Sequence, residues 1–189
     1  MNILIFAAYY HPHIGGYERN IHEMAKRLVQ KGHWVGILTC NTNNSADEVE
    51  TVDGVDIKRL KCIEILNKTY PIPILKYDNW VKMFTRNYGE VNVVITQTRF
   101  CATSLLGLIY AKVKHLPLIH VERGTCHSVV SNPIVRLLSR MYDHTIGSYI
   151  VRSAKVNIGI SKSACDFIRH LGGKNCIEIC NGVDTEIFN

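Results

Sequence analysis

The stretch NILIFAAYYHPHIGGYERNIHEMAKRL, residues 2–28, decides the fold. It begins with an apolar run, Ile3 to Ala8, passes through a loop, and reaches Gly15 and Gly16 just before a segment in which apolar residues recur at helical spacing. That segment ends at Lys31-Gly32, a basic residue followed by glycine, which is typical of a helix end. The stretch predicts a buried strand, a glycine loop and a helix, the opening unit of a parallel α/β sheet.

The same alternation continues along the chain. Most apolar runs are continuous, as in strands covered on both faces; the expected strands are residues 3–8, 34–40, 55–60, 91–96, 118–121, 156–160 and 177–180. The later expected helices are residues 80–88, 105–113, 132–152 with Asn132 as N-cap and Pro133 at the first helical position, and 161–172 with Ser161 as N-cap. Residues 41–54 and 62–76 are expected to be loops. The fold class is therefore α/β, a Rossmann-like, doubly wound parallel sheet forming a single domain over residues 1–189.

Composition excludes several classes of protein. Of 189 residues 47% are apolar, enough for one core, and the net charge of +6 comes from scattered lysines and arginines, which does not indicate a nucleic-acid surface. No apolar run approaches the roughly 18 residues of a membrane span, and the first run is short and lacks a basic leader, which favours a strand over a signal peptide. The seven cysteines contain no CxxC pair. They are expected to be reduced thiols in a cytoplasmic protein, without a disulfide framework or zinc site.

The Gly15-Gly16 pair lies where ligands bind in such folds, beyond the carboxyl end of the first strand. Glycine permits positive φ and close approach to the backbone, so a diphosphate or an acceptor oxygen could rest on this loop at the start of a helix. A tight helix entry that needs glycine explains the pair equally well. The sequence has neither G-x-G-x-x-G nor G-x-x-x-x-G-K-[ST], which excludes a dinucleotide fingerprint and a P-loop.

Polar residues follow other strands at the same edge of the expected sheet. They are Gln97 and Arg99 after one strand, His120, Glu122 and Arg123 at the end of the next, and Asn181 after the last. Most of these residues have a simpler explanation. A strand histidine is more often a hydrogen-bonded core residue than a catalyst, residues 97–99 could be solvated loop polarity, and Asn181-Gly182 could be a turn.

Four stretches together resemble a known family. HPHIGGYER, HVERGT, GISKSACDFI and NGVDTEIF fall in the order and spacing of the N-terminal half of the retaining, nucleotide-sugar-dependent glycosyltransferases of family 4, which have the GT-B fold. The resemblance implies a two-domain enzyme in which the N-terminal domain mainly binds the acceptor. The C-terminal domain, which holds the nucleotide sugar, is absent from this chain and is the expected partner.

The resemblance also implies roles for particular residues. Gly15 and Gly16 match the loop that lies against the donor phosphate and the acceptor pocket, and His120 matches a histidine near the reacting sugar, so it is the expected catalytic residue. The expected substrate-binding residues are Gly15, Gly16, Arg99, Glu122, Arg123 and Asn181. Cys180 stands where the family commonly has proline, and residues 97–99 lack a histidine that some members place there, so the acceptor class stays open.

The implied activity is a hexosyltransferase reaction with retention, from a UDP- or GDP-sugar to a saccharide, lipid-linked or protein-linked acceptor in glycan or polysaccharide biosynthesis. No cofactor is expected in this domain, and no metal, since no D-x-D could chelate a diphosphate. The isolated domain is expected to be inactive. Scattered basic residues, among them Arg136 and Arg140, allow weak peripheral contact with an anionic membrane on its cytosolic face. The alternative is a non-catalytic Rossmann-like subunit that docks on a separate catalytic chain.

Overall fold

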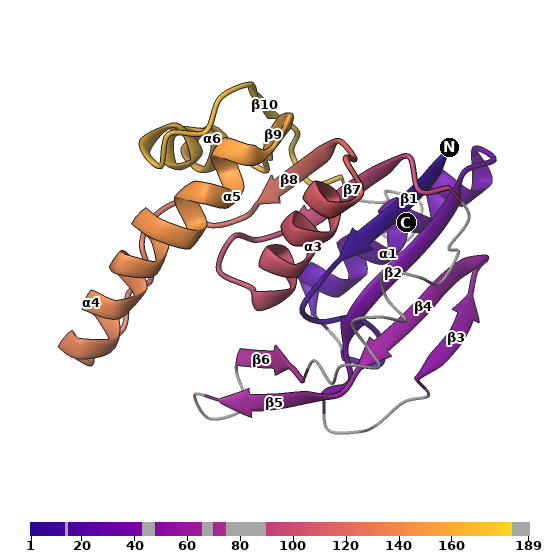
Figure 1. Ribbon diagram of the computed structural model, residues 1–189, viewed down its shortest axis with the longest axis horizontal. Coiled ribbons are helices and arrows are strands. Elements are labelled where there is room, and N and C mark those ends of the chain that lie inside the picture. The colour runs from indigo at the N-terminus through magenta and orange to yellow at the C-terminus, as the bar shows by residue number, and fades with distance from the viewer. Residues whose placement is uncertain (14, 43–47, 66–69, 75–89, 183–189) are drawn as a thin grey trace, which may run out of the picture.

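An eight-stranded sheet forms the centre of the molecule (Figure 1). The computed structural model describes residues 1–13, 15–42, 48–65, 70–74 and 90–182. The strands of the sheet are β1 (Asn2–Phe6), β2 (Trp34–Cys40), β3 (Val49–Val52), β4 (Val55–Leu60), β7 (Val93–Gln97), β8 (Leu118–Glu122), β9 (Val156–Gly159) and β10 (Cys176–Glu178). Their order is β10-β9-β8-β7-β1-β2-β4-β3, and every pair is parallel except β3 with β4. The predicted α/β class and doubly wound sheet are confirmed.

The strand order reverses at β1. The chain proceeds from β1 to β2 and β4 on one side, and later returns to place β7 on the other side of β1, followed by β8, β9 and β10. Ile5 pairs in register with Ile37 of β2 and Ile95 of β7. The point between β1 and β7 is the topological switch point, where the connecting loops diverge and leave a crevice at the carboxyl ends of the strands.

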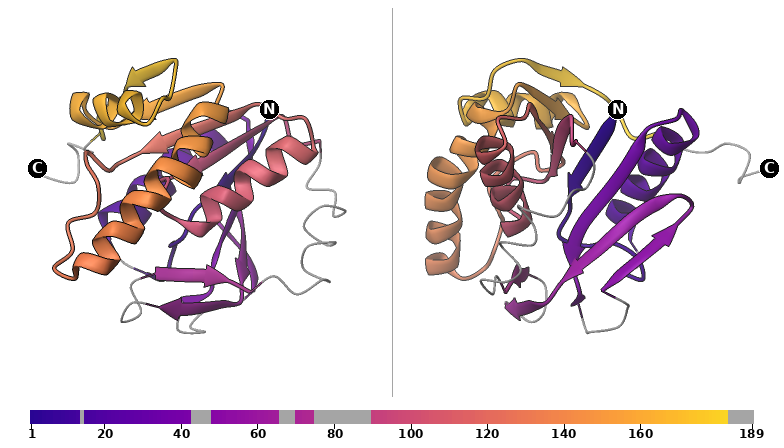
Figure 2. Two further views of the ribbon diagram at one scale, coloured as in Figure 1. Left: turned by 60° about the vertical axis from the view of Figure 1, so that its left-hand side comes forward. Right: turned by 45° about the vertical axis from the view of Figure 1, so that its right-hand side comes forward.

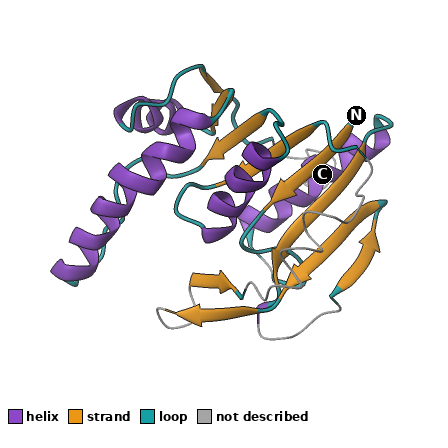
Figure 3. Ribbon diagram, viewed as in Figure 1, coloured by secondary structure: helices purple, strands orange, loops and turns teal. Residues whose placement is uncertain are grey.

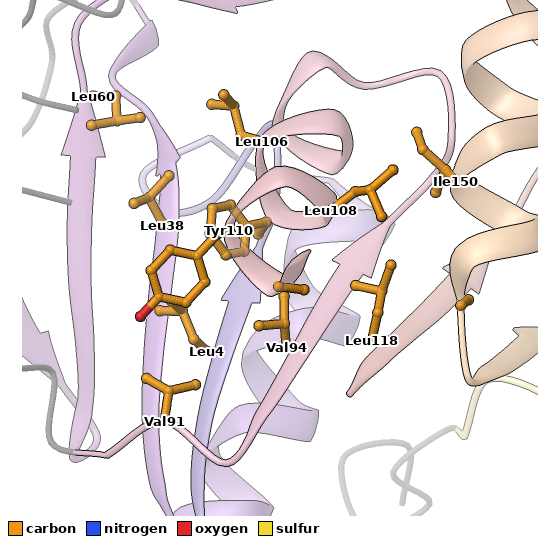
Figure 4. Close-up of a cluster of buried hydrophobic side chains, with 13 residues drawn as sticks. Leu4, Leu38, Leu60, Val91, Val94, Leu106, Leu108, Tyr110, Leu118 and Ile150 are labelled. Atoms are coloured by element: carbon orange, nitrogen blue, oxygen red, sulfur yellow. The ribbon is translucent and has the colours of Figure 1, made fainter. Parts of the chain in front are cut away.

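Helices cover both faces of the sheet (Figures 2 and 3). They are α1 (Gly16–Gln30), α3 (Ala102–Val113), α4 (Pro133–Tyr142), the π-helical η2 (Asp143–Gly147), α5 (Ser148–Ser153) and α6 (Lys162–His170). On one face Ile21 and Ala25 of α1 pack against β1, β2 and β4. On the other, α3 and α5 pack against Leu4, Val94 and Leu118 (Figure 4). The segments α4, η2 and α5 form one long helix whose α4 end extends beyond the sheet (Figure 1).

The helix α3 packs very closely on the sheet at Gly107. A Cβ at this position would lie 2.5 Å from Thr96 Cγ2 and 2.9 Å from Phe6 Cγ. Phe6 and Tyr110 also meet here, with ring centroids 5.9 Å apart. Only the absence of a side chain at Gly107 allows this distance between helix and sheet.

The helix ends follow local chemistry. Asn132 Oδ1 accepts hydrogen bonds from the backbone nitrogens of Ile134 (2.9 Å) and Val135 (3.3 Å), and Pro133 begins α4. Ser161 Oγ accepts a hydrogen bond from the nitrogen of Ala164, at 3.2 Å. Both predicted N-caps are confirmed, and they satisfy N–H groups that have no partner within their own helix.

Two expected loops contain strands. In 41–54 the chain forms β3, which turns back onto β4 through Asp53 and Gly54, with φ of 50° and 78°. Asp-Gly with two positive φ values is a tight hairpin turn, a signal that the sequence carried and that was missed. In 62–76, β5 (Cys62–Ile65) and β6 (Tyr70–Pro73) form a separate antiparallel pair. Its prolines argued against a strand, but a two-stranded pair has free edges that tolerate them.

Two of the expected helices remain to be compared with the structure. The expected helix 80–88 lies outside the described residues. The helix expected over 132–152 is present, with π-helical geometry at Asp143–Gly147 in its middle. None of the helices in the described ranges combines the length and apolarity needed to cross a membrane.

Candidate active site at the switch point

The glycine loop enters α1 at the switch point, with a geometry different from the one expected. Gly15 is extended, with φ −168° and ψ 169°, so the expectation that the pair exploits positive φ is wrong for this residue. Position 15 requires glycine because a larger residue does not fit: a Cβ here would overlap Glu18 Oε2. A Cβ at Gly16 would meet nothing within 4 Å. Glu18 is buried in the first turn of α1, and its carboxylate lies 2.8 Å from His13 Nδ1. The loop is therefore held against the helix start, with open space beside Gly16.

Glu122, the last residue of β8, anchors the next loop. Its Oε1 accepts hydrogen bonds from the backbone nitrogens of Arg123 (2.9 Å) and Gly124 (2.7 Å), and its Oε2 accepts one from the nitrogen of Arg99 (3.2 Å). Burial by itself would raise the pKa of this carboxyl, but the His120 hydrogen bond and the Arg99 charge outweigh it and lower the pKa to about 2. Glu122 is ionised at neutral pH and fastens the loops after β7 and β8 to each other.

His120 lies beneath this anchor and has no exposed surface. Its Nδ1 is 2.9 Å from Thr96 Oγ1 and its Nε2 is 3.4 Å from Glu122 Oε2. Both ring nitrogens thus have protein partners, which is the arrangement of a hydrogen-bonded core histidine. A direct contact between His120 and a substrate stays a prediction.

The side chain of Arg99 also contacts other protein groups. Its side chain forms a bidentate pair with Asp143, with Nε to Oδ1 at 2.9 Å and Nη2 to Oδ2 at 3.2 Å, and its guanidinium lies 4.4 Å from the Phe167 ring centroid. Burial would lower the pKa of Arg99, but the negative charges of Glu122 and Asp143 raise it. The interpretation of residues 97–99 as solvated loop polarity is wrong, since Gln97 and Arg99 are both buried. A substrate contact by Arg99 or Glu122 stays a prediction.

Arg123 joins the elements around the switch point. Its Nη2 donates to Asn20 Oδ1 of α1 (2.8 Å) and Gln97 Oε1 of β7 (3.2 Å), and its Nη1 donates to Asn181 Oδ1 (3.4 Å). The guanidinium lies 5.1 Å from the centroid of the Tyr17 ring. The structure thus brings the predicted residues Arg123 and Asn181 together with Asn20. Asn20 was not predicted, although its position one turn into the first helix places it at the same edge.

The charge of Arg123 is held by neutral groups. Its three oxygen acceptors are amides, and no carboxylate of the described residues forms an ion pair with it. Burial lowers its pKa, and the nearby negative charges of Glu122 and Glu18 offset part of that effect. Within the described part of the chain, Arg123 Nε and Gln97 Nε2 are buried donors without a hydrogen-bond partner. Buried donors that lack a protein partner are suited to the oxygens of an anionic ligand.

A groove of about 520 Å³ opens beside this cluster, between α1 and the segment after β10. One end is lined by Gly16, Asn20, Asn181 and Gly182, and the rest by the α1 residues Arg19, Glu23, Met24, Arg27, Leu28 and Lys31. Three of these side chains are cationic and one is acidic, so the groove favours anionic or hydroxyl-rich molecules. The predicted residue Gly16 therefore lies in a groove, while Gly15 supports the loop beside it.

Comparisons of the sequence with known proteins find glycosyltransferases. The family model described as Glycosyltransferase Family 4 matches residues 14–187. An uncharacterized glycosyltransferase of Methanocaldococcus jannaschii is 33% identical over 192 residues, covering 98% of this chain and 49% of the relative. The chain thus spans about half the length of the curated relative that it matches.

The chain also matches about half the length of each of two solved structures. Sucrose-phosphate synthase from Thermosynechococcus elongatus has a TM-score of 0.64 at 16% identity, covering 98% of this chain and 49% of the synthase. Anabaena HepE in complex with UDP and glucose has a TM-score of 0.63 at 15% identity, covering 100% of this chain and 46% of HepE. At such identities the likeness concerns the fold, which is a Rossmann-like half of a GT-B architecture.

Proposed function

The chain belongs to Glycosyltransferase Family 4, and from this premise we propose that it is the acceptor-side half of an enzyme that transfers a sugar from a nucleotide-sugar donor to a saccharide, lipid-linked or protein-linked acceptor. The reaction is of the hexosyltransferase type and retains the configuration of the transferred sugar. A C-terminal GT-B domain supplies the nucleotide pocket and closes over the switch point. The HepE structure, solved with UDP and glucose, supports a UDP-sugar as donor.

Arg123 carries the proposal. Sugar transfer releases a nucleoside diphosphate, and the developing negative charge on its phosphate oxygens is stabilised by fixed cations and N–H dipoles. Arg123 is such a cation, held in place by Asn20, Gln97 and Asn181 before any ligand arrives. Its Nε donor and the Nε2 donor of Gln97 are buried without a hydrogen-bond partner, so a phosphate oxygen would reach them only if the surrounding loops moved. The start of α1 beside Gly16 adds backbone N–H groups with partial positive charge.

The acceptor lies in the groove along α1 in this proposal. A retaining transfer needs the acceptor hydroxyl on the same face of the sugar as the departing diphosphate, so catalysis depends mainly on positioning. The groove begins at Asn20 and Asn181, which bind Arg123, and extends along α1, which supports an acceptor bound beside the diphosphate. His120 reaches the sugar only if the loop after β8 moves on donor binding, because the histidine is covered in this structure.

The test uses the complete two-domain protein with Arg123→Met and Arg123→Lys. Removing a fixed cation at the developing charge is expected to lower kcat about 100-fold or more. Lysine should restore little, because it cannot form the forked contacts of a guanidinium. Arg169→Met is the control, since Arg169 is exposed and pairs only with Asp166 among the described residues. Activity of Arg123→Met within twofold of wild type, with an unchanged Tm, would refute the role. Nucleotide-sugar binding without turnover in wild type would favour the non-catalytic subunit.

An exposed apolar stripe on α4 supports membrane attachment and hence a lipid-linked acceptor. The stripe consists of Ile134, Leu137, Leu138 and Met141, which are 56–68% exposed and recur at helical spacing. Arg136 and Arg140 flank it, and α4 contains no acidic residue. Apolar side chains that face outward beside arginines suit an anionic lipid surface, where each basic residue adds about 1 kcal/mol. We place this helix on the cytosolic face of the membrane.

Vesicle co-sedimentation tests the attachment. Wild type is expected to bind vesicles containing anionic lipid, more weakly as salt increases, and Leu137→Gln/Leu138→Gln should abolish binding without lowering Tm. Val113→Gln, which changes a 57% exposed apolar side chain on α3, is the matched control. Absence of binding to anionic vesicles would eliminate the attachment. If the double variant instead converted a dimer to a monomer, the stripe would be an interface between copies of the chain.

A further inference from the structure

Three histidines from distant parts of the sequence meet at the end of α6, the helix that packs against β8 and β9. His127 lies in the loop after β8, His144 in the π-helical segment η2, and His170 at the end of α6. Each can direct one ring nitrogen so that the three nitrogens lie within 4.8 Å of one another. The ring centroids are 5.1 to 5.7 Å apart. This cluster lies outside the switch-point site.

His127 is oriented as a metal-binding histidine commonly is. Its Nδ1 lies 2.7 Å from Asp143 Oδ2, and Asp143 is fully buried. A carboxylate on one ring nitrogen fixes the proton there, turns the ring, and leaves a basic lone pair on Nε2. Asp143 is itself held by the bidentate pair with Arg99. Asp143 thus positions the His127 ring, and Arg99 in turn positions Asp143.

The surroundings favour a cation. Two carboxylates, Asp143 and Glu122, face one guanidinium, Arg99, so this buried network carries one formal negative charge next to the histidines. The Phe167 ring forms one wall, edge-on to His127 and stacked with His170 at centroid distances of 5.0 and 5.7 Å. His144 and His170 are exposed, so their rings can move to complete a coordination shell.

We propose that His127, His144 and His170 form a binding site for a divalent transition-metal ion of the zinc type. Imidazole nitrogen suits Zn²⁺, Cu²⁺, Ni²⁺ and Co²⁺, whereas Mg²⁺ and Ca²⁺ prefer oxygen ligands. Tetrahedral Zn²⁺ with Zn–N distances of about 2.0–2.1 Å requires a contraction of the cluster, which the two exposed side chains can provide by changing rotamer. Three protein ligands leave a fourth position for water.

The ion would add a further set of bonds between three elements that already touch through the His127 contacts with Asp143 and Phe167. It would tie the loop after β8 to η2 and α6, and closing such long loops is where a metal clip gains most. The same loop begins with Arg123 and Gly124, whose backbone nitrogens bind Glu122. The site therefore has a structural role that positions this loop, and it requires no particular substrate.

The test is titration of the EDTA-treated, reduced chain with Co²⁺ and Zn²⁺, followed by visible absorption and calorimetry. Wild type is expected to bind one ion and show the visible bands of low-symmetry Co²⁺ with nitrogen ligands, and Zn²⁺ should raise its Tm. His144→Gln and His170→Gln should each weaken binding at least about tenfold, and the double variant should lose the Tm shift. Both positions are exposed, so both variants should fold.

A matched control and a spectroscopic signature separate the proposal from adventitious binding. His115→Asn removes an exposed histidine outside the cluster, at a position with φ of 54° that asparagine tolerates, and should bind like wild type. Near-ultraviolet sulfur-to-cobalt absorption would assign the ion to the cysteines instead. That signature, equal binding by the double variant, or equal weakening by His115→Asn would each overturn the site.

Discussion

Replacing Glu122 by Gln removes a buried charge to which three backbone N–H groups and the Arg99 side chain are attached. A pKa held at about 2, in place of the ordinary 4.5, corresponds to about 3 kcal/mol of stability at neutral pH, since a tenfold change in ionisation constant is worth about 1.4 kcal/mol. Glutamine also turns an amide N–H₂ toward Arg99 or the backbone donors. We expect Glu122→Gln to lower the free energy of unfolding by about 3 kcal/mol at pH 7.

The stabilisation by Glu122 depends on pH in a definite direction. Because the pKa is depressed in the folded state, the stabilisation is complete above pH 4.5 and is lost as the pH falls toward 2. Urea denaturation of reduced protein at pH 7 and pH 3 should show the gap between wild type and Glu122→Gln shrinking by half or more at pH 3. Glu90→Gln, at an exposed position, is the control and should change stability by less than about 0.5 kcal/mol. A gap that is the same at both pH values would refute the reasoning.

Glycine positions supply the remaining predictions. Gly15→Ala should cost about 1 kcal/mol, because the new Cβ displaces Glu18 from its contact with His13, whereas Gly16→Ala should be neutral or slightly stabilising, since its Cβ meets open space at the start of a helix. Equal effects of the two substitutions in urea denaturation would contradict the role given to Glu18. Gly107→Ala should destabilise by about 1–3 kcal/mol through overlap with Thr96 and Phe6, and an unchanged Tm would contradict the close packing of α3.

Features coded by neighbouring residues could be predicted from the sequence. The caps Asn132 and Ser161 act within three residues of their own position, and the continuous apolar runs report directly on strands covered on both faces. The Asp53-Gly54 turn was equally local and could have been used to predict β3. The doubly wound arrangement and the common edge of the polar residues followed from general rules of parallel sheets.

The contacts of the candidate site could not be predicted in the same way. The pairing of Arg99 with Asp143 joins residues 44 positions apart, and nothing in either segment specifies the other. The burial of Gln97 and Arg99 was equally hidden, since both follow the expected strand in a polar stretch typical of a solvated loop. The histidine cluster depends on where η2 and α6 end in space. Such features require the relative placement of helices and sheet, which side-chain packing sets.

The central position of β1 has a consequence for synthesis of the chain on the ribosome. Residues 1–60 contain β1, β2, β3 and β4, which can pair as soon as they emerge, but the other edge of β1 waits for β7 at residues 93–97. During that interval the edge of β1 that will face β7 has no strand beside it, and Ile3 to Phe6 are all large apolar residues. The nascent chain is therefore most prone to aggregation, and most in need of a chaperone, between the appearance of β4 and that of β7.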